Sequence, residues 1–325
     1  IHARLLHDID LKNVSWEPIG TQKKPYNGTF DGNAYTIKNF RLGDHTKPDP
    51  ISEKGLFGWI GSGGTIQDVV VKVENIGSAT NPNNFNITKC GLIAAYNAGT
   101  IRRCSVMVNY TLYVAGEIGV IAYQNSGIIE NCLSAVGTGT GNPKFPGRIP
   151  DEASAAGIAY ENSGTIKNCL FDGKLRTDGF TGNSYVPKDY AIAQNKPNGT
   201  ITNCYYYHSN SSVSGKLYKD GDNHTVISKT QKEMGTGEVT WLLNEEGKND
   251  IWRQRKIDSA DISLNKSYGR VKKNDDGSYA IVTPHIHRLD NGTQTEFKEV
   301  RSLDEITEDK SDTKYYCLSK DVALS

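Results

Sequence analysis

Apolar and polar residues alternate in two short segments that recur five times between Gly55 and Cys204. The first segment reads GLFGWI, GLIAAY, GVIAYQ, AGIAYE and YAIAQN, and the second reads GTIQDV, GTIRRC, GIIENC, GTIKNC and GTITNC. Copies of the second segment begin 35, 28, 37 and 35 residues apart. Such alternation predicts β-strands, and a Gly, Asn or Ser turn separates the two segments. The chain is therefore predicted to repeat a strand–turn–strand unit.

Aligning the five copies places like residues in columns. Two columns hold large apolar residues: Phe57, Ile93, Ile121, Ile158 and Ile192, then Ile66, Ile101, Ile129, Ile166 and Ile201. Small residues follow the first of these columns: Gly58, Ala94, Ala122, Ala159 and Ala193. The next column leads into the turn: Trp59, Ala95, Tyr123, Tyr160 and Gln194. Such columns require a shared interior, because one unit of this length cannot bury its own apolar face.

Stacking the copies at the ~4.8 Å spacing of neighbouring strands would build a continuous core. We therefore predict an all-β solenoid of parallel strands over residues 1–225. Residues 226–272 are predicted to be a capping segment, in which Ser228 and Gln231 resemble a capping box that opens a short helix through EVTWLLN. Residues 273–325 are predicted to be a linker that ends in the start of a further repeat-like strand. Loops are expected at 75–88 and 137–154.

The turn between the two segments carries an asparagine two residues before a glycine in three copies, at Asn97, Asn125 and Asn162. Stacked turns would align these amides into a hydrogen-bonded ladder. Asparagine also tolerates the left-handed backbone that a tight corner often needs, so we expect that conformation at these three residues.

Four of the six cysteines share one column, which begins with a valine, Val69. The column contains Cys104, Cys132, Cys169 and Cys204. A position shared with valine is a packing position, and buried free cysteine behaves as a small hydrophobic residue. We therefore expect a structural ladder of thiols inside the solenoid. Parallel side chains fit disulfide geometry poorly, and the spacings differ from those of zinc knuckles.

Three phrases near the N-terminus resemble the GLUG-type repeat: W-x-P-I-G at 16–20, F-D-G-N-x-Y-T-I at 30–37, and G-L-F-G at 55–58 followed by G-T-I-x-D-V. The later WLLN and IWRQ look like the segment that commonly closes such helices, so the resemblance covers about residues 3–272. Only the first unit has a complete GLFG, and Ile262-Ser263-Leu264 replaces the usual Tyr-Pro-Val-Leu-like phrase.

This resemblance implies a right-handed parallel β-helix with a short helical C-terminal cap. In the GLUG family such helices occur on secreted and surface proteins of bacteria, including adhesin-like proteins and non-catalytic regions of IgA-cleaving peptidases. The tail agrees with a repetitive parent protein, because YCLSKDVALS at 316–325 aligns with ARLLHDIDLK at 3–12. We expect the chain to be a piece of a longer repetitive protein, with export or anchoring signals outside it.

Histidines and carboxylates are the candidate metal-binding and catalytic residues, and they form no recognisable catalytic motif. His285 and His287 would lie on one side of a strand near Asp290, yet no HExxH motif is present, and we predict no metal site and no cofactor. Many parallel β-helices are polysaccharide lyases or hydrolases with clustered acids. Here Asp8 and Asp10 alternate on one side of a strand, Asp31 begins the DGN turn, and Asp68 starts a column that is mostly amide. Asp275-Asp276 precedes a glycine in a hairpin turn. We predict structural roles for these acids.

Aromatic residues form the remaining candidate surface. Trp59, Tyr123 and Tyr160 are expected in an outward or turn-proximal column, and Tyr205, Tyr206 and Tyr207 follow the last coil. Sugar rings stack on aromatic faces, so these six residues are the candidate ligand-binding residues. Nine Asn-x-Ser/Thr triplets are present, and we expect them to be mostly accidental in an Asn-rich chain.

Charge and composition argue against two classes of protein, nucleic-acid binders and membrane-inserted proteins. The chain has 37 basic and 37 acidic residues, which argues against nucleic-acid binding, and no apolar run is long enough for membrane insertion. We predict a non-catalytic structural or adhesive module of a large bacterial surface or secreted protein, whose partners are host glycans or glycoproteins and other domains of the same chain. The alternative is a β-helical carbohydrate-active enzyme, a polysaccharide lyase or glycoside hydrolase.

Overall fold

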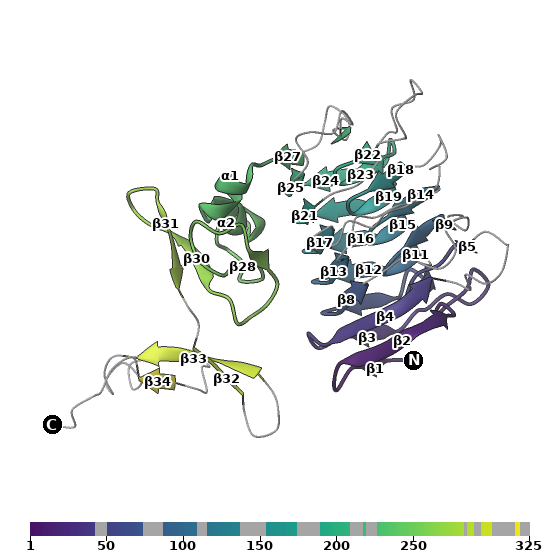
Figure 1. Ribbon diagram of the computed structural model, residues 1–325, viewed down its shortest axis with the longest axis horizontal. Coiled ribbons are helices and arrows are strands. Elements are labelled where there is room, and N and C mark those ends of the chain that lie inside the picture. Colours follow the sequence, from purple (N-terminus) through teal and green to yellow (C-terminus); the bar gives the residue numbers. More distant parts are fainter. Residues whose placement is uncertain are drawn as a thin grey trace. The chain divides into compact units, whose positions relative to one another are not determined.

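The computed structural model describes residues 1–42, 51–73, 87–108, 116–136, 154–173, 189–208, 217–218, 226–282, 285–288, 294–300 and 316–318. The predicted loops at 75–88 and 137–154 lie almost wholly outside these residues. Contacts divide the chain into two compact units, Ile1–Thr230 and Gln231–Ser325, each of which is described by itself. Figure 1 shows the first unit as stacked strands.

The first unit is an all-β solenoid built from four parallel sheets. Sheet A contains β1 (Ala3–Arg4), β3 (Thr29–Asp31), β7 (Thr65–Gln67), β12 (Thr100–Arg102), β16 (Ile128–Glu130), β20 (Thr165–Lys167) and β24 (Thr200–Thr202). Sheet B contains β2 (Ile9–Trp16), β4 (Thr36–Leu42), β8 (Val70–Val73), β13 (Ser105–Val108), β17 (Leu133–Val136), β21 (Leu170–Gly173), β25 (Cys204–His208) and β27 (Val226–Ser228).

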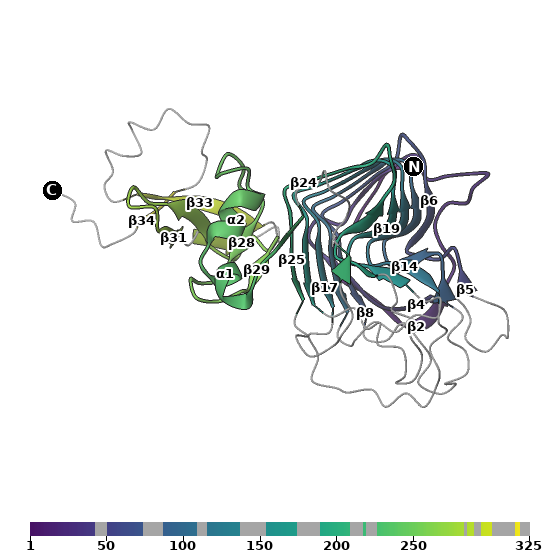
Figure 2. The same cartoon turned by 90° about the horizontal axis from the view of Figure 1, so that it is seen from above.

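The other two sheets complete each coil. Sheet C contains β6 (Phe57–Ile60), β11 (Ala94–Asn97), β15 (Ala122–Asn125), β19 (Ala159–Asn162) and β23 (Ala193–Asn195). Sheet D contains β10 (Cys90–Gly91), β14 (Glu117–Gly119), β18 (Ser154–Ala156), β22 (Asp189–Tyr190) and β26 (Leu217–Tyr218). A short parallel pair joins β5 (Ile51–Ser52) to β9 (Ile87–Thr88). From Cys90 to His208 the chain visits sheets D, C, A and B in turn, so each of these coils adds one strand to every sheet (Figure 2).

The strand register confirms the second apolar column. In sheet A, Ile66 pairs with Ile101, Ile101 with Ile129, Ile129 with Ile166, and Ile166 with Ile201. All five isoleucines are buried. In sheet C, Ala94, Ala122, Ala159 and Ala193 also pair in sequence, whereas Phe57 rather than Gly58 pairs with Ala94. The side chains inside the coils therefore form the core of the first unit.

The left-handed corners lie elsewhere than predicted. Asn97, Asn125 and Asn162 are not among the residues with positive φ. That conformation occurs in the column directly before the cysteines, with φ between 50° and 53°: Asp68, Arg103, Asn131, Asn168 and Asn203. The prediction of the corner was therefore wrong, and its position follows from the chain having to bend between sheet A and sheet B at each of these residues.

A second corner depends on glycine because neighbouring coils approach each other closely. An ideal Cβ added to Gly99, Gly127 or Gly164 would lie 2.1–2.3 Å from a backbone oxygen of the preceding coil. No side chain fits in that space, which explains why each copy of the second segment starts with glycine.

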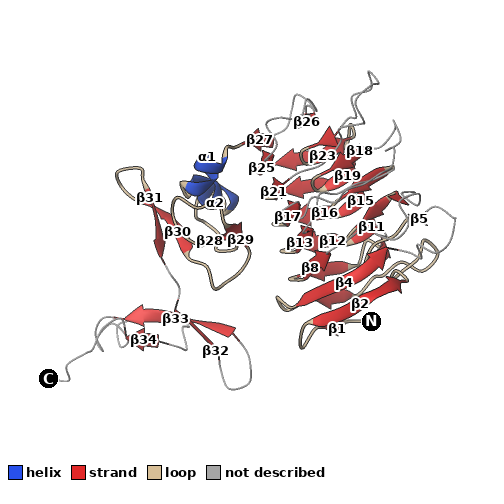
Figure 3. Cartoon of the chain, in the orientation of Figure 1, coloured by secondary structure: helices blue, strands red, loops and turns tan. Residues whose placement is uncertain are grey.

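The second unit contains the helices and several short strands (Figure 3). Helix α1 (Gln231–Gly235) and helix α2 (Glu238–Leu243) are separated at Gly237, whose φ is 96°. The strands form two antiparallel pairs and a three-stranded sheet: β28 (Arg253–Gln254) with β29 (Ile262–Ser263), β30 (Arg270–Lys273) with β31 (Tyr279–Val282), and β32 (His285–Arg288) with β33 (Gln294–Val300) and β34 (Tyr316–Leu318).

The predicted capping box is wrong. Ser228 belongs to β27 and pairs with Tyr206, so it lies in a strand of the solenoid, three residues before the first helical residue. The hairpin predicted at Asp275-Asp276 is confirmed, since β30 and β31 pair antiparallel around it and Gly277 has a φ of 85°. The predicted boundaries at residues 225 and 272 remain predictions.

Candidate functional site

The asparagine ladder is confirmed inside the solenoid. Asn97 donates from Nδ2 to Asn125 Oδ1, Asn125 donates in the same way to Asn162, and Asn162 donates to Asn195, each at 2.7 Å. Asn97, Asn125 and Asn162 are fully buried. The ladder continues one coil beyond the prediction, because Asn195 lies four residues before Gly199 rather than two and escaped the motif.

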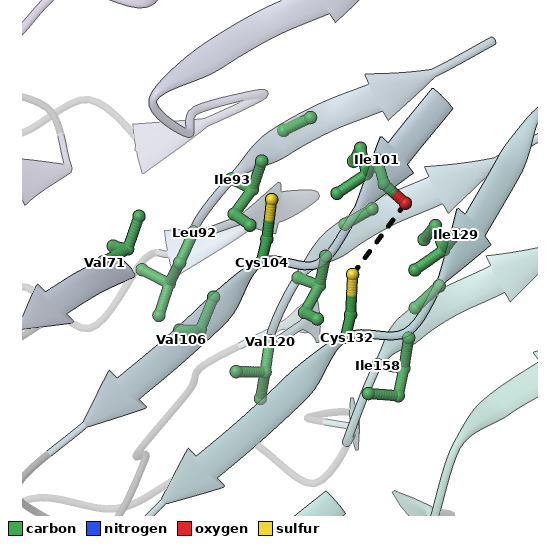
Figure 4. Packing of buried hydrophobic residues seen from close by; sticks show 14 of the residues in the cluster. Val71, Leu92, Ile93, Ile101, Cys104, Val106, Val120, Ile129, Cys132 and Ile158 are labelled. Atoms are coloured by element: carbon green, nitrogen blue, oxygen red, sulfur yellow. Dashed lines mark hydrogen bonds between the residues drawn. The ribbon is translucent and has the colours of Figure 1, made fainter. Parts of the chain in front are cut away.

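The four cysteines form a single file through the interior, as predicted. The residue after each of the last three cysteines donates its backbone N–H to the carbonyl of the cysteine one coil earlier. Leu133 donates to Cys104 in this way, and Leu170 donates to Cys132. All four side chains are buried and carry free thiols. Figure 4 shows Cys104 and Cys132 pointing the same way, with the Cys132 thiol 3.8 Å from the Ile101 carbonyl oxygen. Burial raises the pKa of the Cys104, Cys132 and Cys169 thiols.

The predicted column of Trp59, Ala95, Tyr123, Tyr160 and Gln194 is in register from Ala95 to Tyr160 and wrong at both ends, because Trp59 pairs with Tyr96 and Gln194 pairs with Glu161. Strand pairing instead gives a column that we call the outer column: Trp59, Tyr96, Gln124, Glu161 and Gln194. The cause is a one-residue register shift between the first two copies and another between the last two copies. Leu56 still bonds to Leu92, 36 residues on, whereas Trp59 pairs with Tyr96, 37 residues on.

Aromatic rings nevertheless form a continuous row across the coils. Trp59 stacks on Tyr96 with centroids 4.3 Å apart, and the edge of Tyr96 meets Tyr123 at 5.7 Å. Tyr123 stacks on Tyr160 at 5.7 Å, and Tyr160 meets Tyr190 edge-on at 6.4 Å. Tyr96 and Tyr190 are members that the sequence reading missed.

Tyr123 and Tyr160 lie in the buried part of this row. Their exposed fractions are only 7% and 8%. Both hydroxyls donate to Glu117, to Oε2 and Oε1 respectively, at 3.1 Å. Burial, reinforced by the negative charge of Glu117, raises the pKa of both tyrosines. These side chains therefore join sheet C to sheet D, whereas Trp59 and Tyr96 are partly exposed.

The three tyrosines at the last coil differ in their exposure. Tyr205 and Tyr206 are buried within β25, and Tyr207 is partly exposed. The Tyr205 hydroxyl bonds to Asn203 Oδ1 at 2.9 Å. Ligand contact by these three residues remains a prediction.

Polar side chains complete the outer column, and only Gln194 among them was a member of the predicted column. Gln124 donates from Nε2 to Glu161 Oε2 at 3.3 Å. Lys196 places its Nζ 2.6 Å from Glu161 Oε1 and 3.1 Å from Gln194 Oε1. All of these side chains are partly exposed. Two aromatic rings are therefore followed along the coils by amide, carboxylate and amide groups.

The carboxylates considered for catalysis have structural partners. Asp68 makes a two-pronged contact with Arg103, with Nε–Oδ1 at 2.7 Å and Nη2–Oδ2 at 2.6 Å. Asp31 accepts the backbone N–H of Asn33 and faces Arg4. Asp10 accepts the backbone N–H of Lys12 and the amide of Asn39, and these bonds lower its pKa.

Within the described part of the chain, no three His, Cys, Asp or Glu side chains are placed to hold a metal ion. His285 and His287 lie in β32, as expected of an extended strand, while Asp290 is outside the described residues. Among the described residues, no helix has the length and apolar character needed to span a bilayer.

Comparison of the chain with protein-family models, curated proteins and solved structures gives no match.

Proposed function

We propose that this chain is a non-catalytic module of a large bacterial surface or secreted protein. The solenoid serves as a rigid spacer and presents an adhesive face to host glycans or glycoproteins. The resemblance of its phrases to the GLUG repeat supports the surface location.

The observation that carries the proposal is the continuous set of side-chain ladders. Amide bonds of 2.7 Å link Asn97, Asn125, Asn162 and Asn195 across four successive coils. Buried hydrogen bonds of this kind are costly to break, so neighbouring coils resist separation. Meanwhile Asp31 and Asp68, which a lyase or hydrolase could use, hold neighbouring residues in place. This arrangement fits a rigid module that presents a binding surface better than it fits an enzyme.

A retention assay with the full chain tests the proposal. The protein is immobilised, and retention of soluble mucin is compared with retention of the same mucin after enzymatic removal of its glycans. We expect retention that falls on deglycosylation. The same protein is incubated with a panel of polysaccharides, and reducing ends and unsaturated products are measured.

Two outcomes would contradict the proposal. One is the absence of glycan-dependent retention. The other is polysaccharide turnover that disappears in Asp31→Asn or Asp68→Asn, which would favour the carbohydrate-active enzyme instead.

A further inference from the structure

The outer column defines a surface strip that crosses sheet C from coil to coil. Its members follow one another at the ~4.8 Å spacing of parallel strands. Trp59 and Tyr96 occupy its first two positions, and Gln124, Glu161 and Gln194 occupy the next three. A ligand that lies along this strip would meet aromatic rings at one end and hydrogen-bonding groups at the other.

The aromatic end of the strip is held in place before any ligand binds. Tyr96 stacks on Trp59, meets the edge of buried Tyr123, and donates its hydroxyl to Glu53 Oε1 at 3.0 Å. Tyr123 is fixed in turn by Glu117. Fixed rings lose little conformational entropy on binding, which favours affinity.

The polar end of the strip is nearly neutral. The one carboxylate of the column, on Glu161, is paired with Lys196 and accepts a bond from Gln124. Gln124 and Gln194 are uncharged amides. A strongly charged ligand therefore gains little here, whereas hydroxyl groups can bond to the amide and carboxylate atoms.

We propose that the outer column binds a linear, uncharged glycan laid along the solenoid from Trp59 toward Gln194. This inference rests on the proposed adhesive function and adds its ligand class and location. The apolar C–H faces of sugar rings contact the solvent-facing parts of Trp59 and Tyr96, whose inner faces are stacked on each other. Sugar hydroxyls bond to the side chains of Gln124, Glu161 and Gln194.

Calorimetric titration tests the site. The neutral probes are cello-, xylo- and manno-oligosaccharides and linear poly-N-acetyllactosamine, and the charged probes are oligogalacturonate and chitosan oligomers. We expect at least one neutral probe to bind more tightly than both charged probes. We expect Trp59→Ala to weaken that binding about five- to tenfold, and Gln124→Ala about three- to tenfold.

Thr100→Ala is the matched control, because Thr100 is also a partly exposed strand residue, on sheet A rather than sheet C. The affinity of Thr100→Ala for the neutral probe should differ from that of the parent by less than about twofold, because the substitution lies on the surface and away from the site. Circular dichroism establishes that each variant is folded, and Trp59→Phe replaces Trp59→Ala if the latter unfolds.

The inference is overturned if no neutral probe binds, if only charged probes bind, or if Trp59 and Gln124 variants bind as the control does. Mucin retention separates this failure from that of the adhesive function. Glycan-dependent retention that is equal in all variants leaves adhesion standing and removes the outer column as its site.

Discussion

The buried thiols are the residue-scale feature with the plainest chemical consequence. Cysteine reacts as the thiolate, and burial raises the pKa of Cys104, Cys132 and Cys169, so the reactive form is scarce in the folded protein. Desolvation likewise raises the pKa of Cys90 to about 12. These side chains are also closed to solvent.

We predict that iodoacetamide at mildly alkaline pH leaves these thiols unmodified in the native protein and labels them rapidly in guanidinium. Mass spectrometry of peptides counts the labelled sites. A Cys317→Ser background removes the sixth cysteine, whose side chain lies outside the part of the chain that the structure describes. Rapid native labelling of Cys132 would contradict a closed interior.

Ser134 places a polar hydroxyl inside the apolar core, which lowers the stability of the folded state. It is fully buried in β17, between Val106 and Phe171 of the neighbouring coils, and its hydroxyl has no hydrogen-bond partner among the residues that the structure describes. A buried unsatisfied polar atom costs about 1–3 kcal/mol. The small side chain fits beside the large ring of Phe171, which explains why a serine is sterically acceptable there.

Ser134→Ala should therefore raise the free energy of unfolding by about 1 kcal/mol. Denaturant unfolding measures the change. Ser62→Ala, at an exposed turn, should stay within about 0.5 kcal/mol of the parent. Equal or lower stability of Ser134→Ala would show that the hydroxyl has a partner.

At the scale of the element, the glycine corners set how closely coils can approach. A Cβ on Gly127 would lie 2.1 Å from the carbonyl oxygen of Gly99. Gly127→Ala should lower the free energy of unfolding by about 1–3 kcal/mol or more, because backbone atoms of two coils must separate. Thermal or denaturant unfolding measures this loss.

Gly63→Ala provides the comparison, since the nearest atom to its added Cβ is 3.6 Å away. That variant should lie within about 1 kcal/mol of the parent. If both variants were equally stable, the coils would not be packed at this corner as described.

Strand periodicity was enough to predict the solenoid, the cysteine file and the first three rungs of the amide ladder. It could not place the outer column, because copies of different length can be aligned in more than one way. Hydrogen bonding between backbones decides the register, and it pairs Trp59 with Tyr96. The sequence pattern also did not reveal Asn195 or the positive-φ corner, because both depend on where the chain bends rather than on residue type.

On the scale of the whole molecule, the shared tyrosine–glutamate contacts couple stability to alkaline pH. Tyr123 and Tyr160 have raised pKa values through burial and the charge of Glu117, whereas an unfolded tyrosine has a pKa of about 10. The folded state therefore favours the protonated phenols. Their contribution is fully present below about pH 10 and is lost as pH rises through the raised pKa values.

We predict that unfolding free energy falls with rising pH above about 10, and that the fall is shallower in a Tyr123→Phe, Tyr160→Phe double variant. Denaturant titrations at several alkaline pH values measure both slopes. Identical slopes in parent and variant would assign the alkaline loss to other groups.

The register of the coils is the claim on which the interior ladders and the outer column both depend. Methyl NMR of isoleucine-labelled protein tests it directly, with each signal assigned by its loss in an Ile→Val variant. The account predicts cross-peaks between successive residues of one column, Ile66, Ile101, Ile129, Ile166 and Ile201. Absence of these cross-peaks in a folded protein, or contacts that skip a member of the column, would contradict it.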